Sequence, residues 1–166
     1  MYKKASKNEL DKIFELYKTC RKDLENKGIF QWDDNYPTQE LLKENIKKGN
    51  LYKIEKNNEL VGTFVLNTKV DEFWSEIDWQ NNNFLGLHLL AINPKYQGKG
   101  LGKKVLDFSE QKAKEEGYES LHLDVFSKNP AALNLYKNRG YKKVGKLYFE
   151  FKPVNNRIYY CFEKIL

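Results

Sequence analysis

The chain has few cysteines and arginines and no long apolar run. Cys20 and Cys161 are its only cysteines, too few for a disulfide framework, and no cysteine and histidine residues have zinc-site spacing. No apolar stretch approaches membrane-spanning length, and the first residues lack the apolar core of a signal peptide. We therefore expect buried thiols in a reducing cytoplasm, with no bound metal and no membrane partner.

The positive charge of the chain is scattered rather than concentrated. The net charge is +6, but lysines alternate with acidic residues along the whole sequence and form no basic block. Arginine, the preferred reader of base edges, occurs only at Arg21, Arg139 and Arg157. We expect a lysine-rich, solvated surface without a nucleic-acid partner, although a nucleic-acid-binding module is the alternative. Such a positive field would also attract a small polyanion.

The 166 residues are expected to form a single domain, 1–166, with a well-developed core. Hydrophobic residues make up 40% of the chain and no repeat or linker interrupts it. Apolar periodicity, caps and turn residues predict strands at Tyr2–Ala5, Leu51–Glu55, Leu60–Leu66, Phe84–Ile92, Leu121–Phe126, Lys142–Phe151 and Arg157–Ile165, with one more near Glu76–Trp79. They predict helices at Ser6–Asn26, Thr38–Gly49, from the glycine run to Gly117, and at Asn129–Arg139. The order βααβββαβαββ is that of an α+β fold with a mixed sheet.

A run of alternating glycines lies between an apolar strand and an amphipathic helix. Pro94 ends the strand, and Gly98, Gly100 and Gly102 lead into the helix. Glycine allows positive φ and close approach of a ligand to the backbone. The first turn of a helix has unpaired N–H groups and a positive dipole end. The run therefore predicts an anion site for a phosphate or pyrophosphate.

Two common phosphate-binding loops do not fit this run. A P-loop needs Ser or Thr after its lysine and a glycine five positions before its Gly-Lys pair. Here Lys104 follows Gly102-Lys103, and Gln97 occupies the upstream position. The dinucleotide fingerprint needs a G-x-G-x-x-G spacing soon after a first strand, and this run lies beyond mid-chain. Both nucleotide loops are excluded.

The pattern that fits is Gln/Arg-x-x-Gly-x-Gly/Ala, with Gln97, Gly100 and Gly102 in the context LLAINPKYQGKGLGKKVL. It resembles the coenzyme A pyrophosphate loop of the GNAT superfamily of N-acetyltransferases. The predicted order of elements also matches the fold of that superfamily, a mixed, mostly antiparallel central sheet flanked by helices. The resemblance implies that acetyl-CoA is held by Leu90, Ala91, Ile92, Gln97, Gly98, Lys99, Gly100, Leu101, Gly102 and Lys103. A glycine-rich turn without a ligand is the alternative.

A second segment, residues 121–141, resembles the GNAT strand–Asn–helix–Tyr element. Asn129 is expected to cap the following helix, with Pro130 at its first position. The resemblance implies that Asn129 contacts the pantetheine arm and that Tyr136 lies near the cofactor sulfur. A phenol is protonated at neutral pH, so Tyr136 is the expected general acid toward the departing thiolate. An ordinary N-cap and a core tyrosine are the alternative.

The resemblance implies transfer of an acetyl group from acetyl-CoA to a primary amine by direct attack in a ternary complex. The backbone N–H of Leu90 is our candidate donor to the oxyanion that forms. Some family members carry a basic carboxylate four residues earlier, where this chain has Gly86. His88 is the remaining candidate base, with a purely structural histidine as the alternative. His122 is expected to be an ordinary strand residue.

The acceptor side of the site is less determined. Gln31-Trp32 and Tyr36-Pro37 resemble a loop of a GNAT subgroup with mostly uncharacterised acceptors. The resemblance implies that Trp32, Asp33 and Tyr36 bind the acceptor, since the aromatic residues offer flat walls and the acid attracts an ammonium group. Asp34 could share that attraction, and Trp74 and Trp79 are further candidates for the wall. Alternatively, the aromatic residues of the loop only cover the edge of the core.

The sequence leaves several functions open. The acceptor is expected to be a small-molecule amine, with a protein N-terminus or lysine as a close variant. An acyl-CoA-binding sensor without turnover is the alternative from another class, because no clear base is present. A homodimer is a further possibility, since many relatives form dimers.

Overall fold

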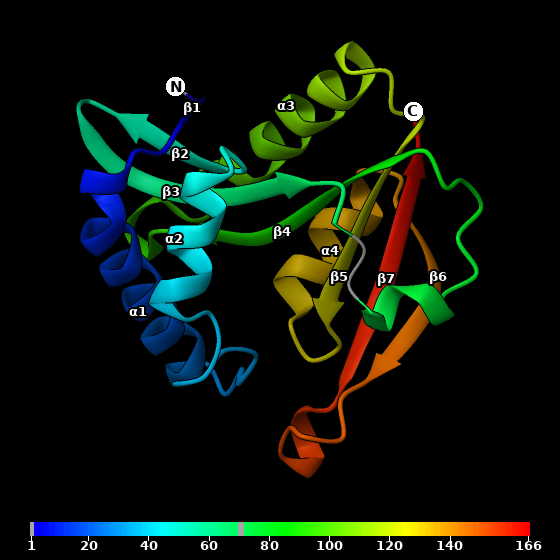
Figure 1. Ribbon diagram of the computed structural model, residues 1–166. Helices are drawn as coiled ribbons and strands as arrows, with labels where there is room; N and C mark the ends of the chain where they lie inside the picture. Colours follow the sequence, from blue (N-terminus) through cyan, green and yellow to red (C-terminus); the bar gives the residue numbers. More distant parts are fainter. Residues whose placement is uncertain (1, 70–71) are drawn as a thin grey trace. The chain divides into compact units, whose positions relative to one another are not determined.

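The computed structural model describes residues 2–69 and 72–166, and its elements follow the predicted order (Figure 1). The helices are α1 (Leu10–Asn26), α2 (Gln39–Lys47), α3 (Leu101–Glu115) and α4 (Pro130–Asn138). The strands are β1 (Tyr2–Lys4), β2 (Leu51–Lys56), β3 (Glu59–Asn67), β4 (Phe84–Ile92), β5 (Ser120–Phe126), β6 (Lys142–Tyr148) and β7 (Ile158–Ile165). The predicted order βααβββαβαββ is therefore confirmed.

The strands hydrogen-bond in the order β1-β2-β3-β4-β5-β7-β6. The β4–β5 pair is parallel, whereas the pairs β1–β2, β2–β3, β5–β7 and β6–β7 are antiparallel. This confirms a mixed, mostly antiparallel sheet. The parallel pair is joined by α3, as a parallel connection requires a crossover.

The chain divides into two compact units, and β4 contributes to both. The N-terminal unit comprises Met1–Leu66 and His88–Leu101, and the C-terminal unit comprises Asn67–Leu87 and Gly102–Leu166. In the N-terminal unit, α1 and α2 run beside the strands and bury their apolar faces against them (Figure 1). Its core includes Ile13, Leu16, Tyr17, Leu42, Leu51, Val65 and Ala91. Helix α1 thus lies against the second half of β4.

In the C-terminal unit, polar contacts tie α3 to the strand β7 and to the segment after α4. Glu110 of α3 accepts a hydrogen bond from the Tyr141 hydroxyl at 3.1 Å and pairs with Lys164 of β7 at 2.7 Å. Apolar side chains fill the interior between these elements; the buried ones include Val105, Leu106, Ala113, Leu121, Leu123 and Phe162. This unit carries α4 and therefore the second predicted signature.

The caps predicted from the sequence are present. The Ser6 N–H donates to the Glu9 carboxylate at 2.9 Å, as in a capping box, and a short 3-10 turn then leads into α1. Thr38 accepts the Leu41 N–H at 3.1 Å and starts α2. Asn129 accepts the Ala132 N–H at 3.1 Å and starts α4. These starts were predictable because a cap is a local interaction.

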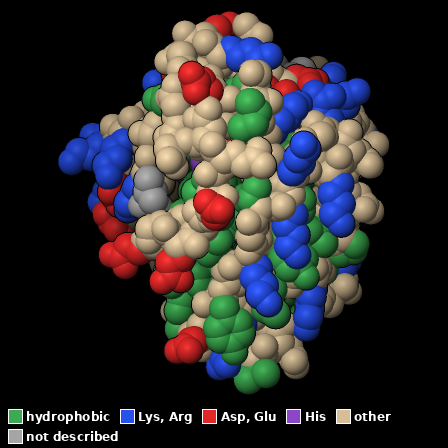
Figure 2. All heavy atoms as spheres, turned by 90° about the vertical axis from the view of Figure 1, so that its right-hand side faces the viewer, with side chains coloured by type: hydrophobic (Ala, Val, Ile, Leu, Met, Phe, Trp, Pro, Cys, Tyr) green, Lys and Arg blue, Asp and Glu red, His purple; other side chains and the backbone are tan. Residues whose placement is uncertain are grey.

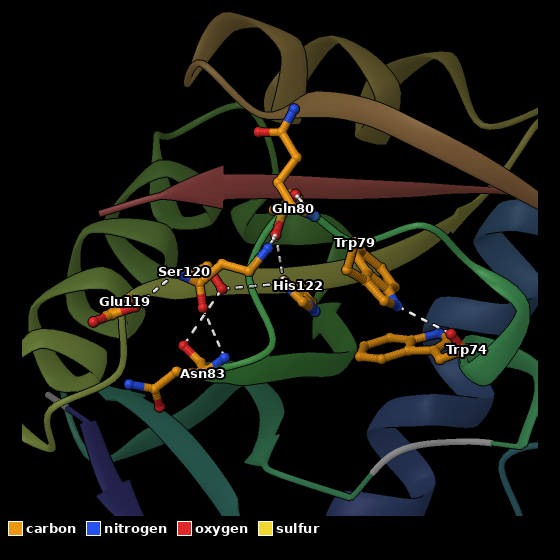
Figure 3. Close-up of polar contacts among 9 residues, drawn as sticks. Trp74, Trp79, Gln80, Asn83, Glu119, Ser120 and His122 are labelled. Carbon is orange, nitrogen blue, oxygen red and sulfur yellow. Dashed lines mark hydrogen bonds and ion pairs between the residues drawn. The ribbon is translucent and has the colours of Figure 1, made fainter.

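The prediction of a strand near Glu76–Trp79 is wrong. The chain forms a 3-10 helix at Glu72–Glu76 and continues as a turn, in which the Trp79 N–H donates to the Ile77 carbonyl at 3.0 Å. The indole N–H of Trp74 donates to Asp124 at 2.8 Å. The indole N–H of Trp79 donates to the Trp74 carbonyl at 3.0 Å, as Figure 3 shows. The hydrogen bonds of the Trp74 and Trp79 side chains are compatible with a compact turn and not with an extended strand.

A buried hydrogen-bond network around Glu163 holds the end of this segment in the C-terminal unit. Glu163 accepts the backbone N–H groups of Gln80 and Asn81 at 3.0 and 2.9 Å, and contacts His122 Nε2 at 2.9 Å (Figure 3). The His122 ring stacks on Trp79, with ring centroids 4.0 Å apart. His122 is therefore a strand residue, as predicted, but one that also organises the turn before β4. Trp74 is buried in the same core, so it does not present the exposed wall considered above.

Strand β6, at the edge of the sheet, is basic on its exposed side. Lys142, Lys143 and Lys146 are exposed, and Figure 2 shows Lys and Arg side chains gathered in a band with hydrophobic groups between them. The Lys143 ammonium lies 3.5 Å from the centroid of the Tyr160 ring. Lysines on an edge strand oppose pairing with another strand.

Within residues 2–69 and 72–166, no helix has both the length and the apolar character needed to cross a membrane.

Candidate functional site

A backbone irregularity lies in the second half of β4, where the sequence predicts the oxyanion donor. Leu89 has φ +53°, a left-handed conformation that is unfavourable for a bulky side chain. The strand is therefore kinked between His88 and Leu90. Leu90, Ala91 and Ile92, which are the predicted cofactor-pairing residues, follow this kink at the end of the strand.

Two side chains of α1 hold the backbone of this kinked segment. The Tyr17 hydroxyl donates to the Leu89 carbonyl at 2.5 Å, and the Cys20 thiol donates to the Ile92 carbonyl at 3.3 Å. Burial raises the pKa of the Tyr17 phenol well above 10 and that of the Cys20 thiol to about 12. Both groups therefore remain protonated donors at neutral pH.

The glycine run leaves its backbone open. Gly98 and Gly100 have φ +72° and +78°, and a Cβ at either position would meet no atom within 4 Å. The first turn of α3 contains no acidic residue, and Lys99 and Lys103 flank its start. A helix N-terminus with exposed glycines and no acidic residue in its first turn fits a pyrophosphate. The local geometry is compatible with a bound pyrophosphate, and the cofactor-binding roles of Gly98, Gly100 and Lys103 stay predictions.

Two side chains of the run already have partners. The Gln97 amide donates to the Ile92 carbonyl at 3.0 Å and accepts from the Lys27 ammonium at 3.3 Å. The Lys99 ammonium donates to the Lys95 carbonyl at 2.9 Å. Gln97 therefore ties the loop to the end of β4, and we expect its contribution to anion binding to come from its backbone.

The predicted acceptor loop packs on α1. Trp32 is only 8% exposed and its ring meets Tyr17 edge-on, with centroids 5.3 Å apart. Tyr36 is 42% exposed and exchanges backbone hydrogen bonds with Asp33. Asp34 pairs with Arg21 at 2.7 Å. Trp32 thus belongs to the core edge, whereas Tyr36 is partly exposed, and the acceptor roles of Trp32, Asp33 and Tyr36 stay predictions.

His88 is a weak base in this environment. Burial lowers its pKa from 6.5 to about 4, so the ring is neutral at pH 7. A neutral imidazole can accept a proton, but the low pKa makes its protonated form unfavourable. The role of His88 as the base stays a prediction.

The buried neutral ring of His88 predicts a pH-dependent stability. His88 has a higher pKa when the chain is unfolded, so the unfolded state takes up a proton first as the pH falls from about 6.5 to about 4. The free energy of unfolding should therefore decrease through this range, by at most about 3 kcal/mol from this group. We expect His88→Gln to flatten the curve measured by urea denaturation at several pH values. Parallel curves for the variant and the native chain would contradict this effect.

In the C-terminal unit, α4 positions the two residues of the second signature. Asn129 is 8% exposed and its side chain is used as the N-cap of α4. Tyr136 lies almost two turns further on, is 6% exposed, and contacts the rings of Tyr141 and Phe162. Burial, and then the charge of Asp124, raise the pKa of Tyr136 well above 10. Its phenol is therefore a protonated donor, as the predicted role requires.

Among the described residues, no group of three or more His, Cys, Asp or Glu side chains is arranged to hold a metal ion.

Sequence reasoning missed the side chains behind the donor strand. It placed Tyr17 on the apolar face of the first helix, but it gave no role to its hydroxyl or to Cys20. The two residues are one helical turn apart, and that spacing was the available signal. Nothing in the sequence indicated which carbonyls they would meet.

The chain belongs to the Acetyltransferase (GNAT) family, whose sequence profile matches residues 10–141. The Bacillus subtilis protein named Uncharacterized N-acetyltransferase YesJ is 26% identical over 146 residues, which cover 85% of this chain and 76% of that protein. A GNAT-family acetyltransferase of Streptococcus agalactiae has a TM-score of 0.83 at 21% identity, over 100% of this chain and 95% of that one. The PaiA N-acetyltransferase of Thermoplasma acidophilum, crystallised with coenzyme A, has a TM-score of 0.73 at 20% identity, over 100% and 98%. These structures confirm the predicted fold.

Proposed function

We propose that this chain is an N-acetyltransferase that transfers the acetyl group of acetyl-CoA to a small primary amine. The observation that carries the proposal is the open glycine run, with Gly98 and Gly100 at positive φ before the start of α3. Membership of the GNAT family supports the same reaction class. The coenzyme A bound to the Thermoplasma relative supports the choice of cofactor. We further propose that residues 1–166 act as one domain, in the cytoplasm, where the free cysteines Cys20 and Cys161 would stay reduced.

The run would bind the pyrophosphate of acetyl-CoA through backbone N–H groups. Those of Gln97, Gly98, Lys99, Gly100, Leu101, Gly102 and Lys103 are the candidates. The lysine ammonium groups would add attraction that salt screens. Leu90 and Ala91 would pair with the pantetheine arm, and Asn129 would contact it. The Ile92 carbonyl already accepts from Cys20 and Gln97, so at that position we expect the N–H to be the available group.

The bound thioester supplies the electrophilic carbonyl carbon. Attack by the neutral amine moves negative charge onto the carbonyl oxygen, where the Leu90 N–H would donate a hydrogen bond. Such a donor accelerates the step because it meets charge that exists only in the transition state. Tyr136 would then donate from its hydroxyl to the departing thiolate. The amine would lose its proton to His88 or to water.

The acceptor would bind against the loop that carries Trp32, Asp33 and Tyr36. Tyr36 is 42% exposed, and the Asp33 carboxylate accepts the Asn35 N–H at 2.8 Å. A carboxylate beside an aromatic face suits an ammonium group. These features support a small amine over a nucleic acid.

The proposal is tested by measuring the release of free thiol from acetyl-CoA. The acceptors are a panel of small primary amines, peptides with free N-termini and lysine peptides. We expect release that depends on a small amine, with the acetylated amine confirmed by mass spectrometry. Release with peptides alone would replace the small-molecule acceptor by a protein. Saturable binding of acetyl-CoA without release for any amine would contradict the enzyme and favour the acyl-CoA sensor.

A further inference from the structure

The peptide group between Leu89 and Leu90 in β4 has a partner on each side. Its carbonyl accepts from Tyr17, and its N–H is the candidate oxyanion donor. The Leu89 carbonyl and the Leu90 N–H belong to this group, and the Tyr17 hydroxyl donates to its oxygen at 2.5 Å. A trans peptide is planar, and its C=O and N–H point in opposite directions. Because the carbonyl points at Tyr17 on α1, the Leu90 N–H points away from that helix. The hydroxyl therefore fixes the direction of the donor.

The conformation of Leu89 needs such support. A left-handed φ of +53° costs a leucine about 1–2 kcal/mol. A hydrogen bond within the protein contributes about 0.5–1.5 kcal/mol, which is of similar size. Strained residues of this kind persist only where the surroundings hold them. Loss of the hydroxyl alone should let the peptide relax toward the extended conformation of a regular strand.

Tyr17 is itself held in place. It is 2% exposed, and Trp32 of the predicted acceptor loop packs edge-on against its ring at 5.3 Å. One turn further along α1, the Cys20 thiol meets the Ile92 carbonyl at 3.3 Å. The Tyr17 and Cys20 side chains, on one face of α1, thus donate to strand carbonyls on either side of Leu90 and Ala91.

We propose that Tyr17 is a positioning residue, whose hydroxyl orients the Leu89–Leu90 peptide so that the Leu90 N–H is presented to the oxyanion. This inference rests on the proposed acetyl transfer. Tyr17 itself touches neither acetyl-CoA nor the amine in this account.

Tyr17→Phe tests the proposal, because it keeps the ring and its packing and removes only the hydroxyl. We expect kcat for thiol release to fall by about tenfold or more, with the KM for acetyl-CoA within about twofold. We also expect the Leu89 carbonyl and Leu90 amide resonances in NMR spectra to shift. Added acetyl-CoA should move the Leu90 amide in the native chain and less in the variant.

Ser109→Ala is the matched control. Ser109 is fully buried in α3 and its hydroxyl also donates to a backbone carbonyl, that of Val105 at 2.8 Å. Ser109→Ala should lower the melting temperature about as much as Tyr17→Phe does. It should leave kcat and the Leu90 amide resonance unchanged. An unchanged kcat in Tyr17→Phe, or an equal loss of kcat in both variants, would overturn the positioning role. If the native chain releases no thiol with any amine, the proposed function fails. If the Leu90 amide resonance is the same in Tyr17→Phe and in the native chain, the Tyr17 hydroxyl does not orient the Leu89–Leu90 peptide.

Discussion

Replacing Tyr136 by phenylalanine is expected to lower kcat for thiol release by about a hundredfold, the typical loss when one donor to developing negative charge is removed. Tyr136 is 6% exposed, and burial raises its pKa well above 10. The phenol is therefore protonated at every working pH. Because a thiol has a pKa of about 8.5, such a phenol stabilises the departing thiolate mainly by donating a hydrogen bond. The affinity for acetyl-CoA should change little.

Tyr141→Phe provides the comparison for this prediction. Tyr141 is also a buried tyrosine of the C-terminal unit, its ring centroid lies 5.9 Å from that of Tyr136, and its hydroxyl donates to Glu110. Removing that hydroxyl should lower stability without a loss of kcat near a hundredfold. Steady-state kinetics at saturating amine, with acetyl-CoA affinity measured in parallel, separate the two variants. Native turnover in Tyr136→Phe would remove Tyr136 from the reaction.

The second large effect is expected at the glycine run. Gly100→Val should weaken acetyl-CoA binding by tenfold or more, because a β-branched residue rarely adopts positive φ and the loop must change its path. The native φ at this position is +78°, with open space around the added Cβ. The loss should therefore come from the backbone, whose N–H groups no longer point at one anion, rather than from a clash.

Gly117→Val separates this effect from general destabilisation. Gly117 follows α3 with φ +83°, and a Cβ there also meets nothing within 4 Å. The two variants should lose comparable stability in thermal unfolding, about 1–2 kcal/mol or more. Only Gly100→Val should lose affinity in calorimetric titration with acetyl-CoA. Equal affinities in the two variants would show that the run does not hold the cofactor.

Much of the fold could be predicted because its signals are local. The polar residues between the two predicted strands Leu51–Glu55 and Leu60–Leu66 favour a tight turn, and Asn57 and Asn58 adopt φ 51° and 61° there, as a two-residue hairpin turn requires. The caps at Thr38 and Asn129 each depend on an N–H three residues away. Interactions this short in range are visible in the sequence itself.

The parts that failed depend on contacts between distant residues. The segment Glu76–Trp79 alternates enough to resemble a strand, but Asp124 and Glu163 bind its neighbours and fold it into a turn. The kink at Leu89 depends in the same way on Tyr17, which lies 72 positions away in the sequence. Propensity cannot reveal a conformation that a distant side chain enforces.

The same difference between local and long-range contacts applies to the candidate site. The local geometry of the glycine run and the cap at Asn129 were predictable because a loop and a cap each form a local unit, whereas the binding and catalytic roles of their residues stay predictions. The base and the acceptor pocket were not, because basicity depends on burial. His88 illustrates this: its pKa of about 4 follows from the protein around it, and no neighbouring residue in the sequence announces it.

Binding of acetyl-CoA is the central claim, and isothermal titration calorimetry of the native chain tests it most directly. We expect saturable binding of one acetyl-CoA per chain that weakens as salt rises, since lysines and a helix N-terminus attract its phosphates. No binding heat at millimolar acetyl-CoA, together with no stabilisation against thermal unfolding, would contradict it.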